Sequence, residues 1–316
     1  MNKRILIVGS LNMDSVIEME QMPVIGETVL GSSLTYIPGG KGANQACAIA
    51  RLGGDVKMLG CVGKDELGEI QKQKLCECGV DISGIKCGSN STGMASIYVD
   101  RQGSNSIVVV PGANKECDIT YLQEYDEAFQ ECEYIILQME IPIETVQYAV
   151  DRGRELGKTI ILNPAPAPGI LQEELLAKLD YITPNEAELM TLSGISGNSV
   201  EDFIKGSNSL LEKGVKNVLV TLGEKGALLV NKDGAKIFPS RKVVSVDTTA
   251  AGDCFNGALA VALSEGKDNA GAIVFANVAS SIAVTRNGAQ TSLPDREETD
   301  RVLMEWEGSL PKTLFE

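Results

Sequence analysis

Short runs of consecutive apolar residues, rich in Val and Ile, recur along the chain between segments with helical periodicity. They occupy residues 5–8, 56–62, 134–137, 159–162, 181–183 and 218–221. Runs without polar alternation are typical of strands that are buried on both faces of a sheet. Strands that alternate with helices predict an α/β fold with a central, mostly parallel β-sheet flanked by helices.

Two segments, 12–38 and 94–110, break this alternation. The first contains short extended pieces separated by turn residues, and the second has the pattern strand, turn, strand around Asp100-Arg-Gln-Gly103. Both predict antiparallel additions that form a small sheet standing off the core, as a lid or as a contact between subunits. No internal repeat, low-complexity tract or Ser/Gly-rich linker divides the chain. We therefore expect one domain over residues 1–316 with these two segments inserted in it.

Composition excludes several classes of function. The 316 residues are 43% hydrophobic, which is enough for a full core. The formal net charge of −15 works against binding to the phosphates of nucleic acids or to anionic lipids. The apolar run at 5–8 is too short for a signal peptide, and no apolar stretch approaches the roughly 20 residues of a membrane-spanning helix. We expect a cytoplasmic protein without a nucleic-acid or membrane partner.

Cysteine and histidine usage narrows the chemistry. The eight cysteines lie in a long chain without a secretory signal, so we expect reduced thiols. Cys76 and Cys78 form the only close pair in the sequence, and a zinc site would need two further ligands at a matching spacing. The chain has no histidine, which excludes Ser-His and Cys-His nucleophile pairs. Carboxylates are therefore the residues that we expect to act as acid or base.

The sharpest signal for a site is the segment 246–259, Val-Asp-Thr-Thr-Ala-Ala-Gly-Asp-Cys-Phe-Asn-Gly-Ala-Leu. Small residues up to Gly252 lead directly into a predicted helix, whose first N–H groups lack intrahelical partners and favour an anion such as phosphate. Asp253 would stand in the first turn, where it could accept the proton of an attacking hydroxyl. The alternative interpretation is that Asp253 only caps the helix or interacts with the helix dipole.

A second candidate is the glycine-rich segment 38–45, Pro-Gly-Gly-Lys-Gly-Ala-Asn-Gln, at the start of another predicted helix. Its glycines allow the backbone to approach a ligand closely, and Lys41 and Asn44 offer donors to sugar hydroxyls. Asn12 and Asp14 follow the first strand, at the edge where α/β sheets bind ligands. The alternative for the glycine-rich segment is an ordinary loop before a helix. The alternative for Asn12 and Asp14 is a simple turn.

Nucleotide binding has no standard motif in this sequence. Segment 153–159, Gly-Arg-Glu-Leu-Gly-Lys-Thr, resembles a P-loop but is one residue short between the glycines and lies between a predicted helix and strand. The first strand is not followed by the glycine fingerprint that a nicotinamide-dependent oxidoreductase would need. Segment 221–227 follows a predicted strand and turns sharply at two glycines. This turn is interpreted either as a contact to a nucleotide or as a tight hairpin.

Asn185 stands at the start of another predicted helix, just after a strand. Its side chain is interpreted either as the N-cap of that helix or as a contact to phosphate. Glu186 and Glu188 lie beside Asn185 in the sequence. They are interpreted either as carboxylates exposed to solvent or as residues that influence a hydrated Mg²⁺ ion.

Five motifs in this order resemble the ribokinase family of carbohydrate kinases. They are Gly-Gly-Lys-Gly-Ala-Asn-Gln at 39–45, Asn-Pro-Ala-Pro at 163–166, Thr-Pro-Asn-Glu at 183–186, Thr-Leu-Gly at 221–223 and Ala-Ala-Gly-Asp at 250–253. The resemblance covers essentially the whole chain. It implies an ATP-dependent kinase that phosphorylates the 5-hydroxyl of D-ribose to give D-ribose 5-phosphate, with Mg²⁺ accompanying ATP and K⁺ as an activator. It also implies a homodimer joined through a small β-sheet lid.

Related kinases acting on 2-deoxyribose, fructose or a nucleoside are the near alternatives. A non-catalytic sugar-binding regulator on the same fold is the alternative from another class, and an intact Asp253 argues against it.

By motif position, the resemblance implies roles for individual residues. Asp253 would be the catalytic base and would also contact the sugar, and the backbone of Ala250, Ala251 and Gly252 would form an anion hole. The other implied sugar contacts are Asn12, Asp14, Gly40, Lys41, Asn44 and Glu140. The implied ATP site uses Asn185, Thr221, Gly223, Gly226, Gly252 and Asn277. The implied monovalent cation site uses Asp247, Thr249, Ala283, Arg286, Gly288 and Ser292, several of them through backbone carbonyls.

Some positions depart from the family pattern. The family often has Gly-Ala-Gly-Asp where this chain has Ala-Ala-Gly-Asp at 250–253, and Thr or Ser where Cys254 follows. Both changes keep the residue small, so we expect activity to be retained, and the Cys254 thiol adds a group that oxidants can attack. Asn277 stands where family members can carry a histidine against the adenine.

Overall fold

The structure is a computed structural model that describes residues 3–307. Its main sheet has nine strands in the order β13-β12-β11-β10-β9-β8-β1-β4-β5. From β11 to β5 the strands are parallel, and β12 and β13 extend the sheet as antiparallel neighbours. Every apolar run that the sequence predicted as a strand lies in this sheet, which confirms the α/β fold with a mostly parallel sheet. The strands are β1 (Ile5–Val8), β4 (Val56–Val62), β5 (Asp81–Cys87), β8 (Tyr134–Leu137), β9 (Thr159–Leu162), β10 (Tyr181–Ile182), β11 (Asn217–Thr221), β12 (Ala227–Asn231) and β13 (Gly234–Phe238).

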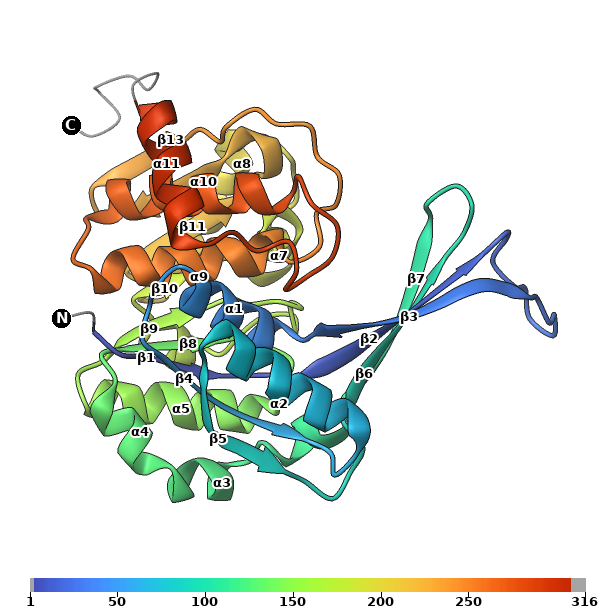
Figure 1. Ribbon diagram of the computed structural model, residues 1–316. Coiled ribbons are helices and arrows are strands. Elements are labelled where there is room, and N and C mark those ends of the chain that lie inside the picture. Colours follow the sequence, from blue (N-terminus) through green and yellow to red (C-terminus); the bar gives the residue numbers. More distant parts are fainter. Residues whose placement is uncertain (1–2, 308–316) are drawn as a thin grey trace.

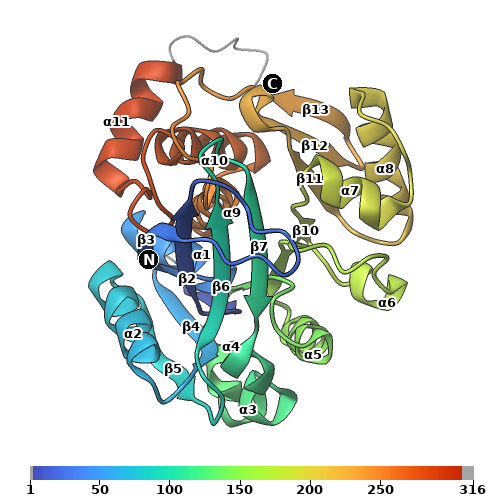
Figure 2. The ribbon, with the colours of Figure 1, turned by 90° about the vertical axis from the view of Figure 1, so that its right-hand side faces the viewer.

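Helices cover both faces of the main sheet (Figures 1 and 2). Alternate residues of a strand face opposite sides, so Ile5 and Ile7 of β1 join one buried apolar cluster while Leu6 and Val8 join the other. One layer consists of α1 (Lys41–Arg51), α2 (Glu66–Cys78), α9 (Ala251–Ser264), α10 (Asn269–Ala283) and α11 (Arg296–Glu307). The other consists of α3 (Ile119–Glu124), α4 (Asp126–Glu131), α5 (Ile143–Glu155), α6 (Glu173–Leu176), α7 (Glu186–Ser193) and α8 (Val200–Glu212). No helix within residues 3–307 is long and apolar enough to cross a bilayer.

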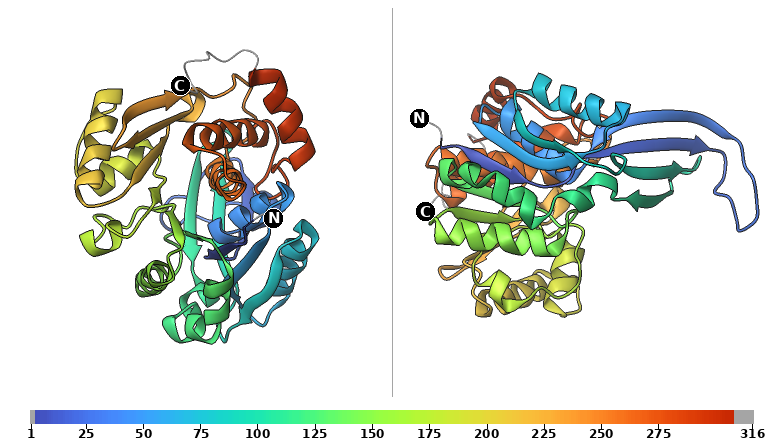
Figure 3. Two further views of the ribbon diagram at one scale, coloured as in Figure 1. Left: turned by 90° about the vertical axis from the view of Figure 1, so that its left-hand side faces the viewer. Right: turned by 90° about the horizontal axis from the view of Figure 1, so that it is seen from below.

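The two irregular segments fold together into a separate four-stranded sheet that projects from the body of the molecule (Figures 1 and 3). Its order is β3-β2-β6-β7, with β2 (Asn12–Met19), β3 (Gly31–Gly39), β6 (Gly93–Val99) and β7 (Asn105–Val110). Each segment is an antiparallel hairpin as predicted, but β2 and β6 pair in parallel. The prediction of antiparallel additions is confirmed within each segment, and the parallel pair joins two segments that are distant in the sequence.

The projecting sheet is attached to the body by a buried side chain of α2. Gln71 Nε2 donates hydrogen bonds to the carbonyl oxygens of Asn12 and Gly39, the latter at 3.1 Å. These two residues pair across β2 and β3 at the base of the sheet. Gln71 therefore holds the root of the small sheet in register with the main body.

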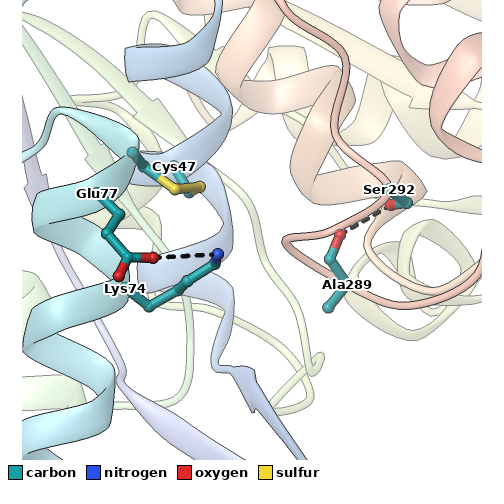
Figure 4. The surroundings of a disulfide bond; sticks show 6 residues. Cys47, Lys74, Glu77, Ala289 and Ser292 are labelled. Atoms are coloured by element: carbon teal, nitrogen blue, oxygen red, sulfur yellow. Dashed lines mark hydrogen bonds and ion pairs between the residues drawn. A yellow bond between two sulfur atoms is a disulfide. The ribbon is translucent and has the colours of Figure 1, made fainter.

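One disulfide bond contradicts the expectation of reduced thiols. Cys47 of α1 and Cys78 of α2 are bonded, with their Cα atoms 5.5 Å apart (Figure 4). Figure 4 also shows the ion pair between Lys74 and Glu77 of α2. The sequence separation of 31 residues carries no pairing signal, and only the packing of α1 beside α2 brings these sulfurs together. Cys76, which the sequence grouped with Cys78, is an exposed free thiol.

The chain order of the parallel strands defines where ligands can enter. After β1 the chain passes through β2 and β3 and returns to β4 on one side of β1, whereas β8 takes the other side. Crevices form at the carboxyl ends of strands where the strand order reverses in this way. Asn12 follows β1 and Glu140 follows β8, so both lie at this point.

The glycine-rich segment 153–159 is not a P-loop. It runs from the end of α5 into β9, and Gly157 has a φ of 69°, as expected for the residue that ends a helix. The sequence prediction against a P-loop is confirmed.

Candidate active site

Asp253 lies in the first turn of α9 and is almost completely buried. Both of its carboxylate oxygens accept hydrogen bonds from side chains of α1: Asn44 Nδ2 donates to Oδ2 at 2.9 Å, and Gln45 Nε2 donates to Oδ1 at 3.0 Å. Burial raises the pKa of Asp253, and attraction to Lys41 and the two amide donors offset only part of that rise. The result is a firmly oriented carboxylate with a raised affinity for protons, as a general base needs.

The N-terminus of α9 is open. Its N-cap residue, Ala250, makes no side-chain capping bond, so Asp253 does not serve as the cap. An added Cβ at Gly252 would meet no atom within 4 Å, which leaves room for a ligand against the backbone. The N–H of Ala251 donates to Thr248 O at 3.2 Å and is therefore partly engaged within the turn. The open helix end favours a bound anion.

Ala250 adopts a left-handed backbone conformation, with a φ of 59°, and is the only residue other than glycine with a positive φ among residues 3–307. An L-residue with a Cβ in this region costs about 1 kcal/mol relative to glycine. Such strain is typical of ligand-binding turns. It gives a physical reason for the glycine that the family often carries here.

Lys41 is the cation of the site, at the first position of α1. Burial alone would lower its pKa, but attraction to the surrounding carboxylates outweighs burial and raises it, so Lys41 stays charged. These carboxylates are Asp253, Glu140, Glu188 and Asp14. The site thus has one buried and three partly buried carboxylates around one partly buried ammonium group.

Glu140 joins the start of α1 to the end of β1. Its Oε2 accepts hydrogen bonds from Ser10 Oγ at 2.5 Å and from the backbone N–H of Lys41 at 3.1 Å. Gly40 precedes Lys41 with a φ of 91°, and a Cβ there would lie 2.6 Å from the backbone nitrogen of Asn12. Only glycine fits this close approach.

Asn12 and Asp14 project from β2 at the base of the small sheet. Asn12 Nδ2 lies 3.5 Å from Glu140 Oε2. The pKa of Asp14 is raised to about 7 by burial and by repulsion from Glu140 and Asp253, while Lys41 lowers it. The structure therefore brings these predicted sugar contacts into one electrostatically coupled group.

Asn114 is a buried residue of this group that sequence reasoning missed. Its Nδ2 donates to Asn12 Oδ1 at 2.8 Å and to the backbone oxygen of Leu11, while its Oδ1 accepts from the N–H of Leu11. It comes from the 3₁₀ helix Gly112–Glu116, about a hundred residues from Asn12 in the sequence. Because Asn114 occupies Asn12 Oδ1, the Asn12 amide presents its N–H groups to Glu140 and to the crevice.

These residues line three cavities, of which two share part of their lining. A polar cavity of about 200 Å³ contains Lys41, Asp253, Gly252 and Glu188, and we call it the catalytic cavity. A cavity of about 910 Å³ shares Thr221, Thr248, Ala251 and Gly252 with it, and we call it the large cavity. A third, of about 360 Å³, is lined by Asn12, Asn114 and Glu140 under Val109 of β7. The open end of α9 therefore lies between the catalytic cavity and the large cavity.

The large cavity is basic in an otherwise acidic chain. Lys225, Arg241 and Lys242 line it, with Glu224 as the one acidic residue of its lining. Three cations around a cavity that ends at a helix N-terminus suit a polyanion such as a triphosphate. Sequence reasoning missed all three because isolated basic residues in loops carry no motif.

The predicted ATP residues surround this cavity, with one exception. Thr221, Gly223, Gly226 and Asn277 line it, whereas Asn185 lines the catalytic cavity. The segment 221–227 is a hairpin between β11 and β12, which confirms the hairpin interpretation, and its turn also lines the large cavity. Asn277 Nδ2 donates to the backbone oxygens of Phe238 and Pro239, which ties α10 to this wall.

Asn185 is the N-cap of α7 and forms a capping box with Glu188. The capping interpretation is therefore confirmed. Glu188 nevertheless lines the catalytic cavity, and burial raises its pKa, whereas Glu186 is half-buried and is not part of that lining.

Comparison with known proteins agrees with this geometry. The model of the pfkB family of carbohydrate kinases matches residues 2–296. The chain is 38% identical over 300 residues to a ribokinase of Haemophilus influenzae, covering 95% of this chain and 98% of that protein. It is 36% identical over 300 residues to a deoxyribokinase of Salmonella typhi, with the same coverage. The structure of Arabidopsis thaliana ribokinase complexed with ribose and ATP superposes with a TM-score of 0.90 at 32% identity, covering 96% of this chain and 99% of that one.

The chain belongs to the pfkB family of carbohydrate kinases. It is an ATP-dependent sugar kinase, and the resemblance inferred from the five motifs is confirmed.

The predicted cation residues gather where two loops meet beside α9. Asp247 Oδ1 accepts from the N–H and the Oγ1 of Thr249, and Asp247 Oδ2 accepts from the N–H of Gly288 at 2.8 Å. The Ala283 carbonyl accepts from the N–H of Arg286, whose side chain pairs with Glu298. Ser292 Oγ instead donates to the carbonyl of Ala289 (Figure 4). Within residues 3–307, no three His, Cys, Asp or Glu side chains cluster as metal ligands, so a cation here would rely on carbonyls.

The raised pKa of Asp14 predicts a pH-dependent cost to stability. Its folded-state pKa of about 7 exceeds the ordinary 3.8, so its contribution to stability is fully present below about pH 4 and is lost as the pH rises through 7. Asp14→Asn should therefore raise the melting temperature more at pH 8 than at pH 4, as measured by calorimetry. An equal change at both pH values would contradict the burial of an ionised Asp14.

Proposed function

We propose that this enzyme transfers the γ-phosphoryl group of ATP to the 5-hydroxyl of D-ribose, giving D-ribose 5-phosphate and ADP. The observation that carries the proposal is the buried Asp253 carboxylate beside the open N-terminus of α9, between the catalytic cavity and a large basic cavity. Ribose as the acceptor is supported by the polar group of Asn12, Asp14, Lys41, Asn44 and Glu140, and by the ribokinases among the relatives.

Each part of the site has a chemical task in this proposal. Asp253 accepts the proton of the attacking hydroxyl, while the backbone at Ala250 to Gly252 and the ammonium of Lys41 stabilise the charge that spreads over the transferring phosphoryl oxygens. The large cavity takes the nucleoside, with Lys225, Arg241 and Lys242 around the phosphates. The transition state for phosphoryl transfer is loose, so orientation by these groups is the main contribution to the rate.

The small sheet acts as a lid in this proposal. Asp14 of β2 and Ala95 of β6 are cross-strand partners, and Ala95 in turn pairs with Val109 of β7, so the three side chains share one face. Val109 lines the same cavity as Asn12 and Glu140. This face covers the sugar and excludes water, which limits hydrolysis of ATP.

The residues present fit the two metal ions of the proposal. Glu188 would hold hydrated Mg²⁺ at the catalytic cavity, because its carboxylate lines that cavity and the N–H of Asn185 engages only its Oε2 among the described hydrogen bonds. Mg²⁺ would supply charge neutralisation for the ATP phosphates. K⁺ would be held by carbonyl oxygens near Ala283 and Arg286 together with Asp247, and the buried amide of Gln290 in the same loop has no described hydrogen-bond partner.

We further propose that the enzyme works in the cytoplasm, because its phosphoryl donor, ATP, is supplied there. The buried position of Cys47 limits access of cytoplasmic reductants to the disulfide.

The substrate proposal is tested by ADP release with ribose, 2-deoxyribose, fructose and adenosine in parallel. We expect the highest kcat/KM with ribose, because a site that hydrogen-bonds each hydroxyl discriminates against analogues that lack one. As a control, Asp253→Asn should bind ATP and ribose but lower kcat by at least about 100-fold. A preference for another sugar would remove the ribose assignment, and no ADP release from any of them would favour a non-catalytic sugar-binding regulator.

Potassium dependence tests the cation site. Replacing K⁺ by tetramethylammonium should lower kcat at least about threefold, since a charge near the α9 N-terminus contributes on the order of 1 kcal/mol. Asp247→Ala should be slower than the wild type in K⁺ and should respond little to its removal. Equal sensitivity of the variant and the wild type would place the cation effect elsewhere.

A dimer formed through the lid is supported by its outward face. Tyr36 pairs with Ser15, and Val108 pairs with Ser96, so both lie on the face opposite to Asp14. Tyr36 and Val108 are 52% and 56% exposed, and Val110 adds to the same face. Exposed apolar surface of this kind is typical of contacts between proteins.

We expect Val108→Glu to convert a dimer into a monomer, because it inserts a charge into the apolar contact. Light scattering after size exclusion measures the mass. Ile170→Glu, at a site that is 72% exposed and lies between β9 and α6, outside the lid strands, is the matched control and should remain dimeric. A dimeric Val108→Glu variant would contradict the lid contact.

A further inference from the structure

A fully buried glutamine of α1 connects the proposed base to a series of other amides. Gln45 Nε2 donates to Asp253 Oδ1 at 3.0 Å and to Asn163 Oδ1 at 3.1 Å, and its Oε1 accepts from Gln138 Nε2 at 2.6 Å. Gln45 and Gln138 have no exposed surface. Both polar atoms of the Gln45 amide are therefore engaged, and the side chain has no alternative partner among those described.

The direction of these hydrogen bonds is dictated by a backbone carbonyl. The oxygen of Thr183, just after β10, can only accept, and Asn163 Nδ2 donates to it at 3.1 Å. Asn163 must then present its Oδ1 to Gln45. Gln45 must in turn present an N–H, and this same Nε2 contacts Asp253. A carboxylate facing this position thus meets a donor and never an acceptor.

Thr183 also fixes the start of α9. Its Oγ1 donates to Asn256 Oδ1 at 2.6 Å, and Asn256 Nδ2 donates to the carbonyl oxygen of Gly252 at 2.8 Å. Thr183 therefore fixes the orientation of Asp253 through Asn163 and Gln45. It also fixes the first turn of α9 through Asn256.

We propose that Gln45 is a positioning residue for Asp253, held in its donor orientation by Asn163 and by the carbonyl of Thr183. The inference rests on the proposed role of Asp253 as the base. Gln45 keeps the carboxylate ionised and oriented in a site whose other charged groups are Lys41 on α1, Asp14 on β2, Glu140 after β8 and Glu188 on α7. It opposes the burial that favours protonation of Asp253.

The test compares two substitutions of equally buried glutamines, Gln45→Met and Gln138→Met, in kcat measured at saturating ribose and ATP from pH 5 to pH 9. Saturation confines the comparison to kcat, whereas titration of Asp14 acts on sugar binding. Loss of a donor to the carboxylate should move the acidic limb of the Gln45→Met profile upward by about one pH unit. The kcat of this variant should fall near neutral pH and recover toward the wild-type value at pH 9. Gln138→Met, which removes only the outer amide, should shift the limb by less than half as much.

Asn163→Ala is the second variant, because it removes the anchor without touching Asp253. It should shift the limb in the same direction as Gln45→Met and leave the KM for ribose unchanged within about twofold, since the hydrogen bonds of Asn163 go to Gln45 and Thr183 and not to a proposed sugar-binding residue. Ser207→Ala on α8, which removes a buried hydroxyl with no described partner, is the control and should leave kcat unchanged. Melting temperatures identify any variant that does not fold.

The outcomes separate this inference from the proposed function. If the wild type releases ADP and Asp253→Asn does not, but Gln45→Met loses kcat equally at all pH values or not at all, the positioning role is wrong and the function stands. Equal shifts in Gln45→Met and Gln138→Met would also overturn it, because buried packing would then explain both. Absence of sugar-dependent ADP release in the wild type would reject the proposed function itself.

Discussion

The site depends on keeping several carboxylates ionised in a small volume shielded from water. Burial and mutual repulsion both favour protonation of Asp14 and Asp253, and one ammonium group, Lys41, lies within reach of them and of Glu140. The charge balance requires Lys41 to be held at the start of α1, and that position requires the left-handed backbone of Gly40. A short glycine-rich turn therefore determines the electrostatics of the whole site.

The fold brings this charged group to an open helix N-terminus without a P-loop. The strand order reverses at β1, so the residues after β1 and β8 lie beside one crevice, and α9 points its uncapped N-terminus into the same place. The catalytic cavity and the large cavity share Ala251 and Gly252. In this arrangement, one open helix end lines both cavities, as the proposed transfer from ATP to the sugar requires.

Several features of the site lower stability and make sense only in terms of ligand binding. Ala250 has a strained backbone, the Oδ1 of the buried Asn44 has no described partner, and Asp14 is held with a pKa of about 7. For Asn44, the hydrogen bond that its Nδ2 donates to Asp253 offsets part of this cost. Large apolar clusters on both faces of the sheet provide the stability that tolerates these costs.

The sequence by itself determined what depends on local pattern. Continuous apolar runs predicted the buried parallel strands, and small residues before Asp253 predicted an open helix end, because both signals lie within a few adjacent residues. The edge strand β5 was not predicted, since its polar and apolar residues mix. The family motifs extended the prediction from secondary structure to most of the candidate site residues.

Tertiary structure alone decided which distant groups meet. Gln45 and Asp253 are 208 residues apart in the sequence, Asn114 and Asn12 are 102 apart, and β2 pairs with β6 in parallel across the intervening α1, β4 and α2. The cations of the large cavity and the Cys47–Cys78 bond are further examples. Hydrogen bonds and charge interactions act over a few ångströms of space. When folding brings together residues that are far apart in the sequence, no local sequence pattern predicts the contact between them.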